Sequence, residues 1–172
     1  MSAAEGKDEK KFLDNYNGQS VEQLLAMKSE YRIDSLVLAF EQAIHKKKDK
    51  KQAPSQVETD ILAVEAMERE VNNGGYHQFF LNSSGEYAGI LPGALERIGC
   101  PLAAKMAKEA LGHLKIEGKV TKGKIDAALD RLGDKLEKDL GKIDERYYKN
   151  TEAIADKLFA YIAANRDKVS LK

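Results

Sequence analysis

The sequence predicts an all-α protein, a single compact bundle of roughly eight helices. Only three prolines, Pro54, Pro92 and Pro101, interrupt its 172 residues. The stretches between them are rich in Ala, Leu, Glu, Lys and Gln, which all favour helices. No run of alternating β-branched residues is long enough to indicate a strand. Helices are therefore the regular structure that we expect the chain to form.

Length and composition predict one domain with a helical extension. Hydrophobic residues make up 42% of the chain and charged residues 33%, which is typical of a globular protein with a heavily charged surface. We expect residues 1–10 to be a disordered tail and residues 11–54 to be an N-terminal helical extension that packs on the main domain. Residues 55–172 are expected to form that all-helical main domain.

Capping residues predict where the helices of the first half begin. Ser20 and Ser55 each lie three residues before a Gln or a Glu, which is the pattern of a capping box. The expected helices cover residues 20–27, 30–48 and 55–72. Because Gly74-Gly75 tolerates positive φ angles, it is expected to end the third helix. A short helical turn over 76–81 and a polar turn should follow.

Proline and glycine divide the second half. A helix is expected over residues 86–98, with a break at Pro92-Gly93 as the alternative, and another should run from Pro101 to about residue 114. Two further helices are expected over 124–140 and 151–166, with residues 143–148 as the connection between them.

The charges of the chain balance. Lys+Arg and Asp+Glu each total 28, so the net charge is zero. Direct nucleic-acid binding and association with an anionic membrane are therefore not expected. The single cysteine, Cys100, allows no intrachain disulfide, the first residues resemble no leader, and no apolar run approaches the roughly 18 residues of a membrane span. These observations predict a cytoplasmic protein.

The residue pattern predicts no catalytic residue, no metal site and no cofactor. The three histidines are widely spaced, and no His-Glu-x-x-His or Cys-x-x-Cys pair is present. Glu65, Glu68 and Glu70 cluster on one helix, but the Glu-x-x-His partner of a di-metal site is missing, so we expect a solvated face there. Cys100 precedes a helix, where the pKa of a thiol can fall, but a buried structural cysteine is the favoured interpretation.

One segment, residues 72–86, stands out because it combines carboxamides, hydroxyls, paired glycines and aromatic rings. Its candidate ligand- or partner-binding residues are Asn72, Asn73, Gly74, Gly75, Tyr76, His77, Gln78, Asn82, Ser83 and Ser84. The favoured interpretation is a corner between helices, where the polar groups cap the backbone and Phe79 or Phe80 fills the core. The functional alternative is a surface that recognises a peptide, a protein or a small polar ligand.

From Glu70 to Glu86 the sequence resembles the signature of a bacterial family, the C-terminal domain of the DNA-mimic proteins. The later run from Asp144 to Tyr148 and the helix that ends at Tyr161-Ile162 are similar to the end of the same domain. The resemblance covers about residues 55–165. It implies an all-helical fold and, in the member that gives the family its name, an acidic surface that imitates DNA phosphates and occupies a transcription repressor.

Three functions follow from these observations. The main hypothesis is a non-catalytic protein–protein interaction module, whose partner is another protein, with a transcription regulator as one candidate. DNA mimicry is the alternative, because a mimic should be strongly negative and this chain is neutral. Mimicry would then need a local acidic patch, formed by Glu65, Glu68, Glu70, Glu86 and Glu96. The second alternative is a small polar ligand binder or an enzyme that uses segment 72–86.

Overall fold

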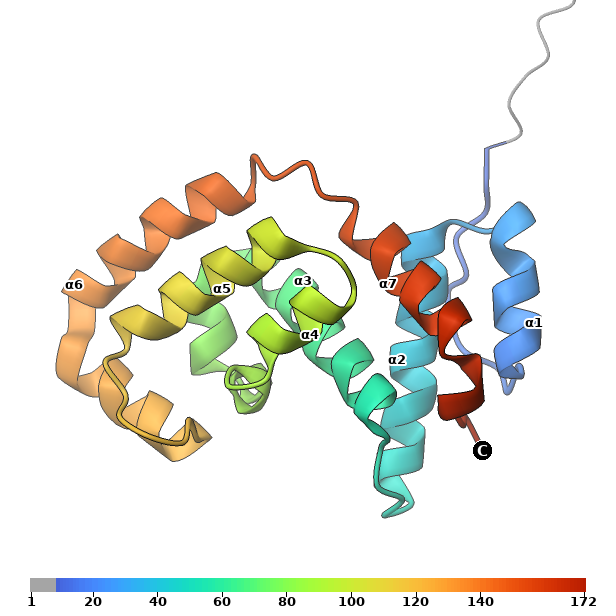
Figure 1. The fold of residues 1–172 in the computed structure, drawn as a ribbon, viewed down its shortest axis with the longest axis horizontal. Coiled ribbons are helices and arrows are strands. Elements are labelled where there is room, and N and C mark those ends of the chain that lie inside the picture. Colours follow the sequence, from blue (N-terminus) through green and yellow to red (C-terminus); the bar gives the residue numbers. More distant parts are fainter. Residues whose placement is uncertain (1–8) are drawn as a thin grey trace, which may run out of the picture.

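A computed structural model describes residues 9–172, and in this part of the chain it contains seven α-helices (Figure 1). The helices are α1 (Val21–Ala26), α2 (Ile33–Asp49), α3 (Gln56–Leu81), α4 (Leu91–Arg97), α5 (Pro101–His113), α6 (Lys122–Tyr147) and α7 (Ile154–Ala164). Short 3-10 turns cover Met27–Ser29, Ser83–Tyr87 and Arg166–Lys168, and the only β pairing among these residues is an isolated bridge between Lys11 and Tyr31. The predicted all-α class is confirmed. The expected tail falls mostly on residues 1–8, which lie outside the described part.

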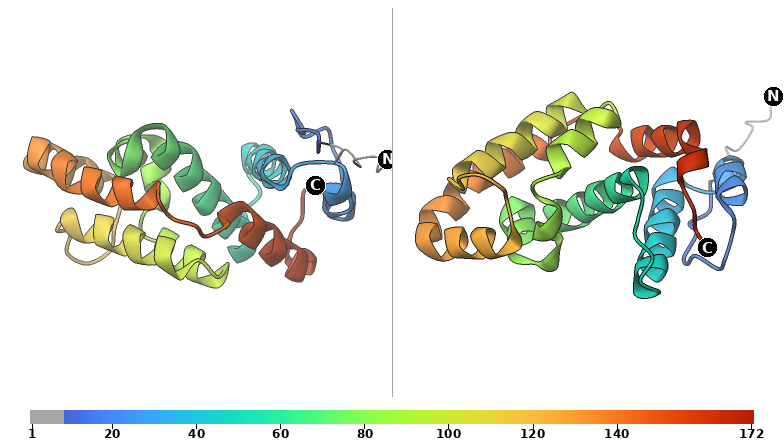
Figure 2. Two further views of the ribbon diagram at one scale, coloured as in Figure 1. Left: turned by 90° about the horizontal axis from the view of Figure 1, so that it is seen from above. Right: turned by 60° about the horizontal axis from the view of Figure 1, so that its bottom comes forward.

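Helix α3 is the centre of the bundle. Figure 1 shows α1, α2 and α7 on one side of it and α4, α5 and α6 on the other, and the two views of Figure 2 agree. Helix α3 contacts α2, α4, α6 and α7, while α2 also packs on α7 and α5 also packs on α4 and α6. A helix that is surrounded in this way has little surface left for solvent, and this decides the environment of its polar residues.

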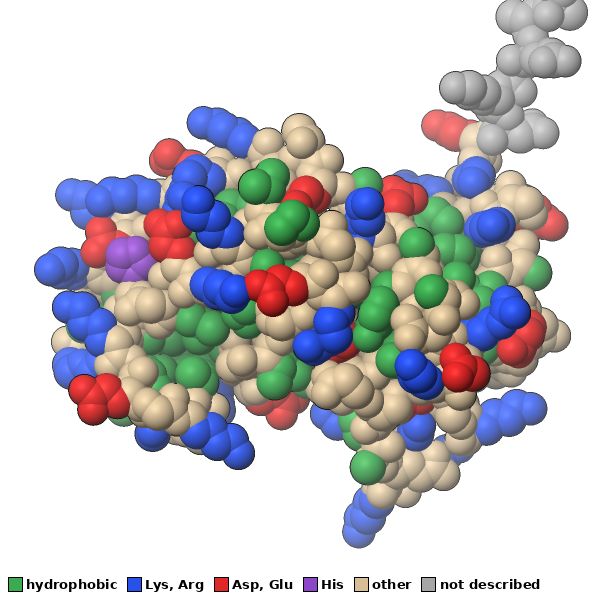
Figure 3. Space-filling model, in the orientation of Figure 1, with side chains coloured by type: hydrophobic (Ala, Val, Ile, Leu, Met, Phe, Trp, Pro, Cys, Tyr) green, Lys and Arg blue, Asp and Glu red, His purple; other side chains and the backbone are tan. Residues whose placement is uncertain are grey.

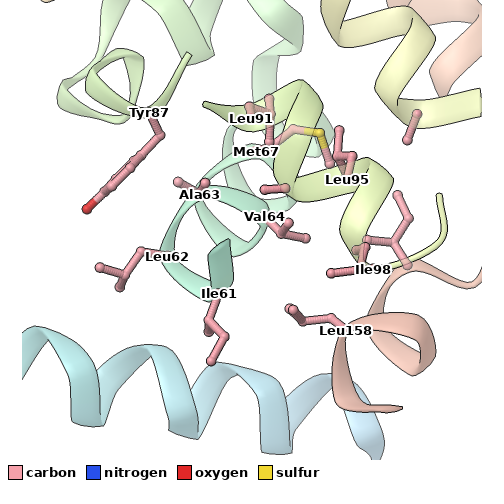
Figure 4. Packing of buried hydrophobic residues seen from close by; sticks show 14 of the residues in the cluster. Ile61, Leu62, Ala63, Val64, Met67, Tyr87, Leu91, Leu95, Ile98 and Leu158 are labelled. Atoms are coloured by element: carbon pink, nitrogen blue, oxygen red, sulfur yellow. The ribbon is translucent and has the colours of Figure 1, made fainter. Parts of the chain in front are cut away.

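Apolar side chains from several helices meet on α3 (Figure 4). Met67 of α3 lies against Leu91 and Leu95 of α4, and Leu158 of α7 reaches the same core from the other side. All four side chains are buried. The core is therefore continuous from the N-terminal helices to the second half of the chain.

Two buried carboxylates tie α3 to its neighbours; the sequence interpretation assigned Glu58 to a capping box only and did not single out Asp60. Glu58 completes the capping box with Ser55 and also accepts from Lys47 of α2 at 2.8 Å. Asp60 accepts from Arg97 of α4 at 2.6 and 2.8 Å and from the hydroxyl of Tyr161 of α7 at 2.8 Å. Because the fixed partners come from three other helices, these carboxylates set how the helices pack.

Most predicted helix starts are close to the observed ones, but two boundaries are wrong. Residues 143–148 do not connect two helices, because α6 continues to Tyr147 and keeps Leu140, Ile143 and Tyr147 buried. The helix expected from residue 86 begins only at Leu91, because a 3-10 turn precedes it and Pro92 suits a first helical turn. No helix in the described residues is both long and apolar enough to cross a membrane.

Candidate functional site

Segment 72–86 forms a sharp corner at Gly74-Gly75. Gly75 has φ 75° and ψ −176°, so the helical path of α3 is interrupted and resumes at Tyr76. The freed backbone N–H of Tyr76 donates to Oδ1 of Asp144, on α6, at 2.8 Å. Burial raises the pKa of Asp144, although the bond from Tyr76 and the nearby His77 oppose this. The corner is therefore held by a residue 68 positions away.

The polar side chains after the corner converge on Glu70. Its carboxylate accepts from Nε2 of Gln78 at 2.8 Å, from Nδ2 of Asn82 at 2.9 Å and from Oγ of Ser84 at 3.1 Å. Burial alone would raise the pKa of Glu70, but these three bonds and the charge of Arg69 outweigh it and hold the pKa below its ordinary value. The three donors thus stabilise an ionised, buried carboxylate.

The other candidate residues of the segment divide between core and solvent. Tyr76 is fully buried against Phe79, Phe80 and Tyr147, and its hydroxyl has no hydrogen-bond partner among residues 9–172. Asn72 is exposed and donates to the backbone oxygen of Glu68 at 2.7 Å. Three more keep some contact with water, namely Asn73 and Ser83, which are exposed, and His77, which is half-buried. The arrangement is that of a structural corner.

The five acidic residues proposed as a patch do not lie on one exposed surface. Glu65 and Glu70 are buried and Glu68 is half-buried, so the expectation of a solvated face is wrong. These side chains are removed from solvent because other helices cover α3 on several sides. Glu86 and Glu96 are exposed, and each lies near a lysine, Lys48 and Lys108 respectively.

Burial is unequal between acids and bases. Among the described residues, the buried charged side chains are all acidic: Glu41, Glu58, Asp60, Glu65 and Glu70. Glu41, Glu58 and Asp60 each pair with a cation, Arg69, Lys47 and Arg97 respectively. Within residues 9–172, Glu65 and Glu70 are the buried acids that form no ion pair. Figure 3 shows Lys and Arg side chains interspersed with Asp and Glu on the face in view, which bears no continuous acidic area.

A polar pocket of about 200 Å³ adjoins the corner, between α3, the end of α6 and the segment that leads to α7. Glu68, Asn72, Tyr147, Tyr148, Asn150 and Glu152 line it. The hydroxyl of Tyr147 donates to the carboxylate of Glu68, and burial raises the pKa of Glu68 to about 7. Sequence reasoning found only Asn72 and Glu68 here; the family-like run ending at Tyr148 was the signal that could have found the tyrosines.

Metal and thiol chemistry find little support in the geometry. No group of three or more His, Cys, Asp or Glu residues in the described part of the chain is placed to hold a metal ion. Cys100 is buried, and burial together with the charge of Glu152 raises the pKa of its thiol to about 11. A thiol with such a pKa stays protonated near neutral pH, so Cys100 is not an activated nucleophile.

The corner and the end of α6 both lie in a stretch, residues 52–165, that matches the family model described as DMP19-like protein. The chain belongs to the DMP19-like protein family. No curated protein and no solved structure gives a significant match. The DMP19-like region therefore contains helices α3 to α7, the corner at Gly74-Gly75 with Glu70, and the adjoining pocket.

The Gly75→Ala substitution should destabilise this DMP19-like protein by about 2–3 kcal/mol. A side chain at φ 75° and ψ −176°, a combination that essentially only glycine adopts, costs on the order of 1–3 kcal/mol. The added Cβ would also overlap the carboxylate of Asp144 and disturb its bond to Tyr76. Urea denaturation followed by circular dichroism measures the change. Gly141→Ala is the control, because Gly141 is helical with open space around its Cα and should be neutral or slightly stabilising. Equal stabilities of the two variants would contradict the geometry of the corner.

The Glu70→Gln substitution should cost about 2 kcal/mol, because a carboxamide cannot accept from all three donors and its own N–H₂ would face them. Thermal unfolding at pH 7 measures the loss. The matched control is Glu145→Gln, an exposed position on α6, where we expect less than about 0.5 kcal/mol. A Glu70→Gln variant as stable as the wild-type protein would mean that the three donors form hydrogen bonds to water instead.

Proposed function

We propose that this protein is a non-catalytic binding module and that its partner is another protein, a DNA-binding regulator. The observation that carries the proposal is that the polar side chains of the corner bond within the fold: Gln78, Asn82 and Ser84 all donate hydrogen bonds to Glu70. Side chains committed to holding the fold are not available as acids, bases or nucleophiles. Membership in the DMP19-like family supports a partner that itself binds DNA.

DNA mimicry is the second candidate, because the family includes it. On this chain, the candidate acidic row is Asp134, Glu137 and Glu145, which are exposed and share one face of α6. Exposed Lys138 lies within the same face. A row with bases inside it attracts a DNA-binding site less than a polyanion does, so mimicry is ranked below binding through mixed contacts.

The experiment uses the tagged full chain as bait in nuclease-treated extract of its native cell. Proteins retained at physiological salt are identified, purified and tested for direct binding. We expect a DNA-binding protein whose affinity for the bait changes little between low and physiological salt, since the bait has no net charge. Failure to retain any specific protein at physiological salt would contradict the proposal.

The same purified pair separates the two candidates. Mimicry requires that operator DNA and this chain exclude one another, and that affinity falls steeply as salt rises. A variant carrying Asp134→Asn, Glu137→Gln and Glu145→Gln would then lose binding. The control changes the same number of exposed acids outside the family region, with Asp14→Asn, Glu22→Gln and Glu30→Gln. Equal binding by the two triple variants would reject the acidic row as the contact surface.

A further inference from the structure

The pocket beside the corner offers hydrogen-bond acceptors but few free donors. Nδ2 of Asn72 donates to the backbone oxygen of Glu68 at 2.7 Å, and the hydroxyl of Tyr148 donates to the backbone oxygen of Val71 at 2.8 Å. Nδ2 of Asn150 lies 3.3 Å from a carboxylate oxygen of Glu152. The hydroxyl of Tyr147 is also engaged, by Glu68, so the donors left over are the second N–H of Asn72 and that of Asn150, beside the carboxylate oxygens of Glu68 and Glu152.

The two carboxylates of the pocket differ in what neutralises them. Oε1 and Oε2 of Glu152 accept from the backbone N–H groups of Leu102 and Ala103, at the start of α5, at 2.9 and 2.8 Å. Glu68 has the Tyr147 hydroxyl as a partner but forms no ion pair with any described residue. The guanidinium of Arg146, on the same turn of α6 as Tyr147, pairs with Glu109 at 2.6 Å. Glu68 is thus a carboxylate without a counter-charge at the wall of an open pocket.

A second unpartnered group lies close to Glu68. The Tyr76 hydroxyl is fully buried and bonds to none of the residues that the structure describes, and its ring packs edge-on against that of Tyr147, with 6.2 Å between centroids. Burial, then the charges of Asp144 and Glu68, raise the pKa of Tyr76, so its hydroxyl stays protonated. Polar groups are normally paired in a folded interior. Tyr76 packs behind the pocket and does not line it, so Glu68 is the group that presents an uncompensated charge to the pocket itself.

We propose that this pocket binds one primary ammonium or guanidinium group, with Glu68 as its counter-ion and the rings of Tyr147 and Tyr148 as aromatic walls. The pocket volume of about 200 Å³ suits one small head group. The two rings meet at 80° with centroids 6.2 Å apart, and a cation gains energy against the face of such rings. No Lys or Arg lines the pocket to compete for it. The inference does not depend on the proposed function, because a free amine and a partner's Arg or Lys present the same group.

Binding should depend on pH with a defined sign. A cation binds the ionised form of Glu68, and since its pKa is about 7, affinity should fall below pH 7 and proton release should accompany binding at pH 6.5. The charged and titratable groups around Glu68 are Glu65 of α3, Asp144, Arg146 and Tyr147 of α6, Tyr76, Cys100, Glu152 and Lys157. Of these, Glu65, whose pKa is about 8, changes charge in the same range and acts in the same direction.

In the test, the full chain is titrated with methylguanidinium or butylammonium while the NMR signals of its backbone amides are monitored. Urea and butanol serve as neutral controls. We expect saturable shifts confined to residues 68–72 and 147–154 for the two cations alone. Calorimetry in buffers of different ionisation enthalpy should detect the released proton at pH 6.5 and much less release at pH 8.5. Shifts that are unsaturated, scattered over the surface or equal for the neutral controls would overturn the proposal.

Variants link the signal to the residues. Glu68→Gln should weaken cation binding about tenfold or more, because one charged hydrogen bond is lost. Glu22→Gln, at an exposed position of α1 away from the pocket, should leave it unchanged. If Glu68→Gln does not fold, Tyr148→Leu takes its place: Tyr148 is 54% exposed, and loss of its ring should weaken binding several-fold. Wild-type affinity in the folded variant would reject the assigned counter-ion or the aromatic wall.

Short capped peptides distinguish the source of the cation. Acetyl-Gly-Arg-Gly-amide is compared with its Lys and citrulline counterparts and with free methylguanidinium. Tighter binding of the Arg or Lys peptide than of the free ion identifies a protein side chain as the occupant, and the reverse order identifies a free small amine. Binding of the neutral citrulline peptide as tightly as the Arg peptide would overturn the proposal. None of these results affects the pull-down, so failure of the pocket and failure of the proposed function are distinguishable.

Discussion

Replacing Glu65 by glutamine is expected to raise the free energy of unfolding by about 4 kcal/mol at pH 8 and by less than about 1 kcal/mol at pH 5. Glu65 is buried on α3, and burial, with the charges of Glu41 and Glu68, raises its pKa from 4.5 to about 8. Arg69, the guanidinium nearby, bonds Glu41 at 2.7 Å. The ionised form of Glu65 is therefore poorly compensated.

The sign of this pH dependence follows from the proton balance. Between pH 4.5 and 8 the folded protein keeps a proton on Glu65 that the unfolded chain has lost, so the wild-type protein loses stability as pH rises through this window. Glu68, whose pKa is raised to about 7 by burial, contributes in the same direction over a narrower range. A neutral glutamine has no proton to lose, so the variant should have a flatter profile.

Urea denaturation at half-unit steps from pH 5 to pH 8.5 measures both profiles. Glu137→Gln, an exposed position on α6, is the matched control and should reproduce the wild-type slope. Parallel profiles for wild-type protein and Glu65→Gln would contradict the buried, poorly compensated carboxyl.

Phe80→Ala should lower the free energy of unfolding by about 3–5 kcal/mol. The ring is 1% exposed and packs against Phe79, with centroids 5.6 Å apart, and against Tyr76 at 6.2 Å. Removing it leaves a cavity at the point where α3 resumes after the corner. For a chain of this size the melting temperature should fall by about 10 °C.

The neighbouring residue provides the control for Phe80→Ala. Leu81 follows directly in the chain but is 56% exposed, so Leu81→Ala should change stability by less than about 0.5 kcal/mol. A comparison of the two melting curves tests which side chain fills the core. Similar losses for both variants would mean that the end of α3 is turned differently from the arrangement described.

Local signals in the sequence predicted most of the helical framework. Both predicted capping boxes form, at Ser20 and at Ser55. In each box the serine hydroxyl accepts from the backbone N–H three residues later, and the side chain of that later residue accepts from the backbone N–H of the serine. Gly75 interrupts α3 at a positive φ, and α5 begins at Pro101. The misplaced end of α6 has the same local origin, since Gly141 suggested a break where burial of Ile143 and Tyr147 keeps the helix continuous.

The sequence by itself determined the all-α class, the family and the position of the corner at Gly74-Gly75, because helix propensity, the family motif and the tolerance of glycine for positive φ depend on neighbouring residues. The bond from Tyr76 to Asp144 that holds the corner was decided by packing. Only the tertiary structure decided which acidic side chains on α3 are buried. Glu65 and Glu70 are polar by residue type, but whether they are exposed to water depends on the other helices that cover α3. The pocket at Glu68 likewise needs Tyr147 and Tyr148, which lie nearly 80 residues away in the chain. Contacts at such separations result from packing, and no local pattern encodes them.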